Sequence, residues 1–134
     1  TFAYEDQKAS TLEDGLYVLE SDLKDKAFVS KMAKFVKATL KGWDYAVANP
    51  KEAAEIVVEQ DASGAATVEV QQRQMENVAK LITSANTPKM GYLDPAAYKR
   101  TISVLLSGGS SPVIKKDPGD KAMTHVVWDA AAKL

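Results

Sequence analysis

The chain has 134 residues, of which 46% are hydrophobic and 26% are charged, a composition typical of one globular domain and unlike that of a disordered segment. Basic residues total 17 and acidic residues 18, so no overall positive field exists that would hold nucleic acid or an anionic membrane. The absence of cysteine excludes disulfides and thiolate sites, and every apolar run is far shorter than the roughly 20 residues of a membrane-spanning helix.

The first 24 residues predict two short strands. Residues 1–7 alternate the aromatic side chains of Phe2 and Tyr4 with smaller or polar neighbours, and residues 15–21, GLYVLES, form a short β-rich run. Two isolated strands are only marginally stable. We therefore expect the strands that complete their sheet to lie outside this sequence.

Residues 26–48 predict one amphipathic helix of about six turns. Its apolar residues recur at helical spacing, and four lysines share the opposite side: Lys31, Lys34, Lys37 and Lys41. Trp43 follows the apolar spacing, so we expect it in the core, with Gly42 allowing a neighbour to approach closely.

A second helix is predicted to follow at once, because the sequence reads Asn49-Pro50. Proline disfavours the α conformation of the residue before it, and it suits the first position of a helix. Asn49 is therefore expected to be the N-cap. Glu52 lies three residues later, where its carboxylate is expected to accept from the Asn49 backbone N–H in a capping-box arrangement.

Three further helices are predicted, beginning after Thr67, Asp94 and Asp120. The first should end near residue 85, and the second, which starts with Pro95, should end at the glycine pair 108–109. The residues expected to face inward in the last helix are Met123, Val126, Val127, Ala130 and Leu134. The chain by itself is thus predicted to be mainly α-helical, with about five helices after two short strands.

Few side chains suggest chemistry. His125 is the only histidine, and without a second histidine or a cysteine nearby we expect a structural or surface role rather than metal binding. The pairs Glu5-Asp6 and Glu13-Asp14 lack a nucleophile or base partner, so we interpret them as solvated turn residues rather than catalytic groups. The lysine row favours a solvated helix face over a docking site for an acidic partner or lipid headgroups. We expect no catalytic residues, no metal and no cofactor.

Two stretches of the sequence are similar to a known family. The first is DGLYVLESDLKD followed by FVKATLKGWDYAVANPKEAA, and the second is GYLDPAAYKRTISVLLSGG. From about Tyr4 to Gly109 the chain resembles periplasmic substrate-binding proteins of ABC importers. The branch concerned includes binders of the thiamine pyrimidine precursor, nitrate and alkanesulfonates.

The resemblance implies a two-lobed α/β protein with the type II periplasmic-binding-protein-like fold, about twice as long as this chain, that closes around a small molecule. Residues 1–24 would be hinge strands, and residues 25–134 would complete one lobe. This chain would then be the C-terminal part, with the missing N-terminal half as a partner. It begins with Thr1 rather than Met, which fits a removed signal peptide or a start inside a longer protein, and the resemblance favours the second.

The resemblance also places the ends of the two predicted strands near the ligand cleft. The residues expected to contact the ligand are Tyr4, Glu5, Asp6, Asp14 and Tyr17. An aromatic ring beside a carboxylate suits a nitrogen heterocycle, and the family also binds small anions. Ordinary solvated residues at strand ends are an equally good interpretation of the same five positions.

The expected function is therefore that of a periplasmic solute-binding component of an ABC transporter, without enzymatic activity. Its expected partners are a small-molecule ligand and the ABC permease, and nucleic acid is not expected. The alternative is a stand-alone helical protein-interaction domain, whose exposed apolar surface would make a homo-oligomer or bind another protein. The same exposed surface would also favour a homo-oligomer if the chain is a fragment.

Overall fold

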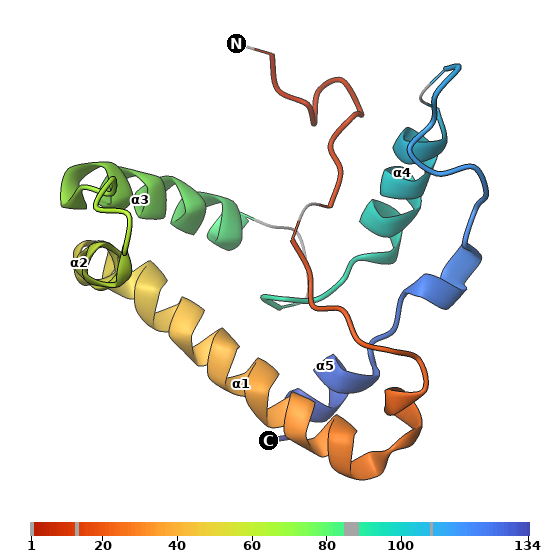
Figure 1. Ribbon diagram of the computed structural model, residues 1–134, viewed down its shortest axis with the longest axis horizontal. Coiled ribbons are helices and arrows are strands. Elements are labelled where there is room, and N and C mark those ends of the chain that lie inside the picture. Colours follow the sequence, from red (N-terminus) through yellow and green to blue (C-terminus); the bar gives the residue numbers. More distant parts are fainter. Residues whose placement is uncertain (1, 13, 85–88, 108) are drawn as a thin grey trace.

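The computed structural model describes residues 2–12, 14–84, 89–107 and 109–134, and these ranges are mainly helical, as predicted. The helices in chain order are η1 (Asp22–Lys24), α1 (Lys26–Ala48), α2 (Pro50–Gln60), α3 (Val68–Ser84), α4 (Pro95–Leu106), η2 (Gly119–Ala122) and α5 (Val126–Ala131), where η marks a 3₁₀ helix. Figure 1 shows α1 along one edge of the molecule, with α2 and α3 at one of its ends. The N-terminal segment runs between α3 and α4.

Helix α1 has the predicted bounds because local signals define both of its ends. The Asp25 carboxylate accepts a hydrogen bond from the Ala27 N–H at 2.8 Å, which satisfies one of the free amides of the first turn. At the other end the Asn49 N–H donates to the Tyr45 carbonyl oxygen, and Pro50 begins α2 as predicted.

The capping box predicted for α2 is wrong. The Asn49 N–H is already used by the last turn of α1, where it donates to Tyr45 O at 2.9 Å, so it has no hydrogen left for Glu52. The Glu52 carboxylate instead accepts from the Tyr45 hydroxyl at 2.7 Å. The Asn49 side-chain amide also donates to the Tyr45 carbonyl oxygen. These contacts tie the two helices together at their sharp corner.

The main core lies between α1 and α5. Ala33 and Val36 of α1 and Ala131 of α5 are buried, and Ala131 has no exposed surface at all. The partly buried side chains around them are Leu40, Val127 and Ala130. A helix of six residues is not stable alone, so α5 depends on this packing against α1. The two alanines let the helices approach closely.

Helices α3 and α4 begin with the predicted capping residues. The Val70 N–H donates to the Thr67 hydroxyl at 3.4 Å, and Asp94 accepts from the Ala96 N–H at 3.0 Å ahead of Pro95. Ile102 is the buried residue of α4. The last described residue of α3 is Ser84, and residue 85, where its end was predicted, lies outside the described residues, as does Gly108.

The two predicted strands are wrong for the described parts of residues 1–21. Residues 4–9 instead form one helical turn, in which the Ala9 N–H donates to Tyr4 O and the Lys8 N–H to Glu5 O, both at 2.9 Å. Lys8 has the positive φ of 55° that closes such a turn. Residues 14–19 have no regular structure and no ladder partner in the described chain. A strand requires that partner, so β propensity alone does not create one.

Several predictions near the core also need correction. Asp120 does not cap the last helix, because Pro118 and Gly119, with a φ of 62°, begin the short helix η2 instead. Helix α5 starts only at Val126, which leaves Val126 and Leu134 exposed. Trp43 is also exposed, and a Cβ on Gly42 would meet nothing within 4 Å, because α5 packs on α1 only around Ala33 to Leu40.

The chain exposes far more surface than a folded protein of its mass. Its accessible surface is 10271 Å². A folded monomer of 14.5 kDa is expected to expose about 6,900 Å². Among the described residues, the buried hydrophobic side chains are limited to Ala33, Val36, Ala54, Ile102 and Ala131, which fits this excess.

Candidate functional site

Three of the five predicted ligand residues lie together in the N-terminal turn. Tyr4, Glu5 and Asp6 are all exposed, and Tyr4 retains 77% of its accessible surface. The Glu5 carboxylate accepts a hydrogen bond from the Ser10 hydroxyl and lies 3.9 Å from the guanidinium of Arg100. The turn therefore presents an aromatic ring and a carboxylate beside a cation.

Helix α4 holds this turn in place through polar contacts. The Arg100 Nε–H donates to the Ser10 carbonyl oxygen at 3.3 Å, and the Leu12 N–H donates to the Thr101 hydroxyl oxygen at 2.9 Å. Sequence reasoning missed Arg100. It is one of only two arginines in the chain, and its residue type was the available signal, because guanidinium groups favour carboxylate partners.

The other two predicted ligand residues lie apart from the turn. Asp14 and Tyr17 are exposed, and the Tyr17 ring lies over Gly15, whose added Cβ would be 3.4 Å from the tyrosine oxygen. Across the described ranges, no hydrogen bond, ion pair or ring contact joins either residue to Tyr4, Glu5 or Asp6. Glu13, of the predicted carboxylate pair, lies outside the described residues.

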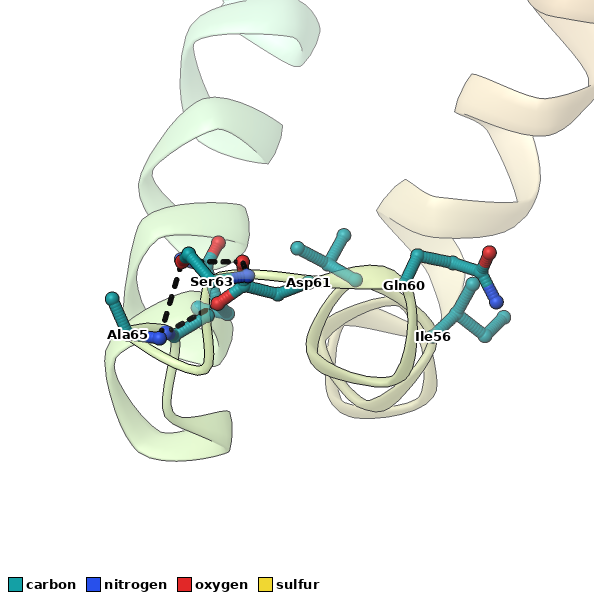
Figure 2. Close-up of a pocket in the computed structure, with 8 residues that line it drawn as sticks. Ile56, Gln60, Asp61, Ser63 and Ala65 are labelled. Atoms are coloured by element: carbon teal, nitrogen blue, oxygen red, sulfur yellow. Dashed lines mark hydrogen bonds between the residues drawn. The ribbon is translucent and has the colours of Figure 1, made fainter.

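A shallow hollow of about 600 Å³ lies at the loop between α2 and α3. Figure 2 shows Ile56 and Gln60 from α2 on one side and the hydrogen-bonded loop of Asp61, Ser63 and Ala65 on the other. Its lining is mostly apolar and open to solvent, and Asp61 is its ionisable side chain. The hollow offers an aliphatic surface without a converging set of charges.

Asp61 fixes the shape of that loop. Its carboxylate accepts from the Ser63 hydroxyl at 2.6 Å, from the Ser63 N–H at 2.9 Å and from the Ala66 N–H at 2.7 Å. The Ser63 hydroxyl bond first, and then the backbone donors, hold the pKa of Asp61 below its ordinary value. A carboxylate with these internal partners is a turn-forming group, as is common for aspartate.

A second hollow, of about 360 Å³, lies beside α4. Tyr98, Ile102 and Leu106 line one side of it, and the loop residues Asp117, Gly119 and Asp120 line the other. The Tyr98 hydroxyl donates to the Gly119 carbonyl oxygen at 2.7 Å and fastens that loop to the helix. The side chains here hold the loop, and no nucleophile and base are paired among them.

His125 belongs to an aromatic cluster that joins α5 to the loop before α4. Its ring stacks on Tyr92 with centroids 4.5 Å apart, and Tyr92 meets Trp128 edge-on at 5.2 Å. The Nε2 atom lies 2.7 Å from the Leu93 carbonyl oxygen, so Nε2 carries the hydrogen. The Trp128 Nε1–H donates to Met90 O at 3.3 Å. His125 therefore has a structural role, as predicted.

Three further kinds of site were considered: a metal site, a membrane-spanning helix and the lysine row of α1. Within the described ranges, no group of three or more histidines and carboxylates is placed to hold a metal ion. The helices described here are too short or too polar to cross a bilayer. Lys31, Lys34 and Lys41 of α1 are exposed and Lys37 is half-buried, and none forms an ion pair in the described part of the chain.

Comparison with known proteins gives one finding. Residues 1–53, from the N-terminal segment through α1 to the start of α2, match a family described as NMT1/THI5 like. The match supports the resemblance to substrate-binding proteins over that stretch, and it does not include the later part, up to Gly109. Searches of curated proteins and of solved structures returned no match.

Proposed function

We propose that this chain is the C-terminal part of the solute-binding component of an ABC-type importer. The whole protein would capture a small molecule by lobe closure and deliver it to a membrane permease in the periplasm. The observation that carries the proposal is the family match over residues 1–53, because that stretch contains the first of the two motifs behind the resemblance. No covalent chemistry is part of the mechanism.

The exposed surface of the chain supports the same proposal. An accessible area of 10271 Å², well above the roughly 6,900 Å² expected for this mass, fits a chain whose apolar surface is covered by further polypeptide. The exposed, β-rich residues 14–19 would then find their ladder partners in the N-terminal half. Residues 1–24 would act as the hinge, and residues 25–134 would complete one lobe.

The N-terminal turn is the part of this chain that we propose to contact the ligand, together with Asp14 and Tyr17. Tyr4 and Tyr17 provide flat apolar surfaces, and Glu5, Asp6 and Asp14 provide acceptors for the N–H groups of a nitrogen heterocycle. For a small anion the relevant group would be the Arg100 guanidinium beside Glu5. The two ligand classes therefore depend on different side chains at one place.

The experiment is a ligand screen on the polypeptide that cells make from the gene containing this sequence. Its melting temperature is measured with the thiamine pyrimidine precursor, nitrate and an alkanesulfonate, because a ligand at a hundred times its Kd stabilises by about 2.7 kcal/mol. We expect one of these classes to raise the melting temperature. Glu5→Gln should reduce the shift caused by a nitrogen heterocycle, and Arg100→Gln should reduce the shift caused by a small anion. Val113→Ser, at an exposed position outside the turn, is the control. If no ligand in any class changes the melting temperature, the proposal fails.

A further inference from the structure

Residues 14–20, DGLYVLE, form an exposed apolar segment that we call the arm. Leu16, Tyr17 and Leu19 are 60%, 86% and 70% exposed. Among the described residues, the only backbone hydrogen bond of the arm is the one that the Leu19 carbonyl accepts from the Asp22 N–H. Asp14 and Glu20 stand at its two ends. The arm is therefore an apolar surface, bounded by acidic residues, with almost all of its backbone groups free.

Helix α1 carries a second exposed apolar surface, which we call the strip and which consists of Phe28, Phe35 and Trp43. Their spacing of seven and eight residues places them along one side of the helix. Phe35 is 52% exposed, Trp43 is 41% exposed, and Phe28 is half-buried. The strip borders the side of α1 that packs against α5, so α5 leaves it uncovered.

The two surfaces differ in charge. Helix α1 has five lysines and one aspartate, whereas the described residues before it include six carboxylates and two lysines. Lys31 was predicted on the side opposite the apolar residues, but it lies three residues after Phe28 and four before Phe35, so its ammonium group is a neighbour of the strip on the helix surface. The acidic ends of the arm and the basic helix are therefore electrostatically complementary.

The area available is large enough for a stable contact between copies. The chain exposes about 3,400 Å² more than the scaling expected for its mass, given its 10271 Å². An interface of standard size buries about 800 Å² on each partner. The excess exposed area of the whole chain is therefore larger than one partner's share of such an interface.

We propose that two copies of the 134-residue chain associate by reciprocal exchange, with the arm of each copy lying on the strip of the other. Charge excludes the simpler pairings. Contact between two strips would bring two strongly basic helices together, and antiparallel pairing of two arms about Tyr17 would place Asp14 opposite Glu20. The exchanged contact places apolar side chains together and acidic groups beside lysines. This inference does not rest on the proposed function, since it concerns the 134-residue chain by itself.

The test begins with sedimentation equilibrium of the chain over a dilution series. We expect a reversible change from a mass of 14.5 kDa to twice that value. Phe35→Ser should remove the strip contact, and Tyr17→Ser with Leu19→Ser should remove the arm contact, each raising the dimer Kd at least about tenfold. Leu81→Ser replaces an equally exposed apolar residue on α3 and should leave the Kd unchanged. Circular dichroism confirms that each variant keeps its helices.

Mixing the two defective variants separates the exchanged dimer from other dimers. The arm variant keeps an intact strip and the strip variant keeps an intact arm. The mixture should therefore form a heterodimer through one intact contact, at concentrations where each variant alone is mainly monomeric. Higher salt should weaken this heterodimer. A chain that stays monomeric at every concentration overturns the proposal. So does a dimer insensitive to both sets of substitutions, or a mixture that does not associate.

Discussion

The two halves of this molecule are held together by different forces. Helices α1 and α5 pack through the buried side chains of Ala33, Val36 and Ala131. The N-terminal segment and α4 are joined mainly by polar contacts at the surface, from Ser10 and Leu12 to Arg100 and Thr101. Apolar burial contributes free energy that water cannot replace, whereas exposed hydrogen bonds exchange readily with solvent. We therefore expect the N-terminal segment and α4 to separate before α1 and α5 do.

This difference matters because the family match includes both kinds of structure. Within the matched stretch, the described residues 2–12 and 14–20 are mainly exposed, whereas α1 contributes to the packed core. Helix α1 is held by its packing against α5, whereas the N-terminal segment before it stays accessible. A segment with few buried contacts opens at low free-energy cost, and such segments often bind ligands or other chains.

The largest effect is expected at Ala131, which has no exposed surface between α5 and α1. Ala131→Leu adds three carbon atoms to a close helix contact and should destabilise the fold by about 1–3 kcal/mol. Urea denaturation followed by circular dichroism measures the change. Ala132→Leu, at the next and exposed residue, is the control. Equal stability of the two variants would contradict the importance of the core between α1 and α5.

The next largest loss of stability is expected from substitution at Gly91, in the loop before α4 that supports the aromatic cluster. Gly91 has a φ of 73°, and an added Cβ would lie 3.0 Å from the Leu40 Cδ2 atom. Gly64 has a φ of 67° with open space around it. Both alanine variants incur the backbone cost of about 1–2 kcal/mol, and Gly91→Ala should be the more destabilising because of the contact. Equal unfolding free energies would mean that the loop moves away from Leu40 easily.

On the α4 side, Asp94→Ala should cost about 1 kcal/mol, because it removes the hydrogen bond to the Ala96 N–H at the start of the helix. Asn49→Ala should cost less, since the Asn49 side chain makes no cap hydrogen bond to α2. Helix content and thermal melting of both variants are compared. A larger loss from Asn49→Ala would show that its contact with Tyr45 O, rather than helix capping, dominates.

The contact between Arg100 and the N-terminal segment should be weak. Arg100→Ala should change the global unfolding free energy by less than about 0.5 kcal/mol, since both charged groups are substantially exposed. Hydrogen exchange of the Leu12 amide should nevertheless increase, because the segment loses one of its anchors. Thr101→Val removes the acceptor for the Leu12 N–H and provides the matched comparison. Unchanged exchange in both variants would mean that other contacts hold the segment.

The smallest effect is expected at Asp61 and confined to its loop. Its pKa is lowered below the ordinary value of 3.8, chiefly by the Ser63 hydroxyl. A lowered folded pKa means that the loop contacts stabilise fully above the ordinary value and are lost as pH falls through the lowered one. Amide shifts of Ser63 and Ala66 in an NMR titration should therefore report a pKa under 3.8. In Ser63→Ala that pKa should rise towards 3.8, and no change would show that the backbone donors dominate.

Sequence reasoning succeeded where the deciding interactions are local. The bounds of α1, the corner at Asn49-Pro50 and the cap at Asp94 all depend on residues within one turn of one another. The predicted strands were wrong because a strand needs a distant partner. The capping box at Glu52 was wrong because the Glu52 carboxylate accepts its hydrogen bond from the Tyr45 hydroxyl of the preceding helix, and not from the Asn49 N–H.

The candidate site was harder to predict for the same reason. Glu5 stays a predicted ligand residue, and the cation beside it comes from α4, 95 residues later in the sequence. No spacing rule connects Glu5 with Arg100 before the fold is known. Asp14 and Tyr17 stay predictions, since their positions depend on what covers the arm.

The most direct test of the proposed function is the mass of the polypeptide that carries α1 in the cells that make it. An antibody against α1 isolates that polypeptide, and mass spectrometry of the intact chain gives its length. The proposal predicts a protein of about twice the length of this chain, secreted across the membrane and stabilised by a small ligand. A polypeptide of 14.5 kDa in the cytoplasm, paired with itself and unaffected by any ligand, would contradict it.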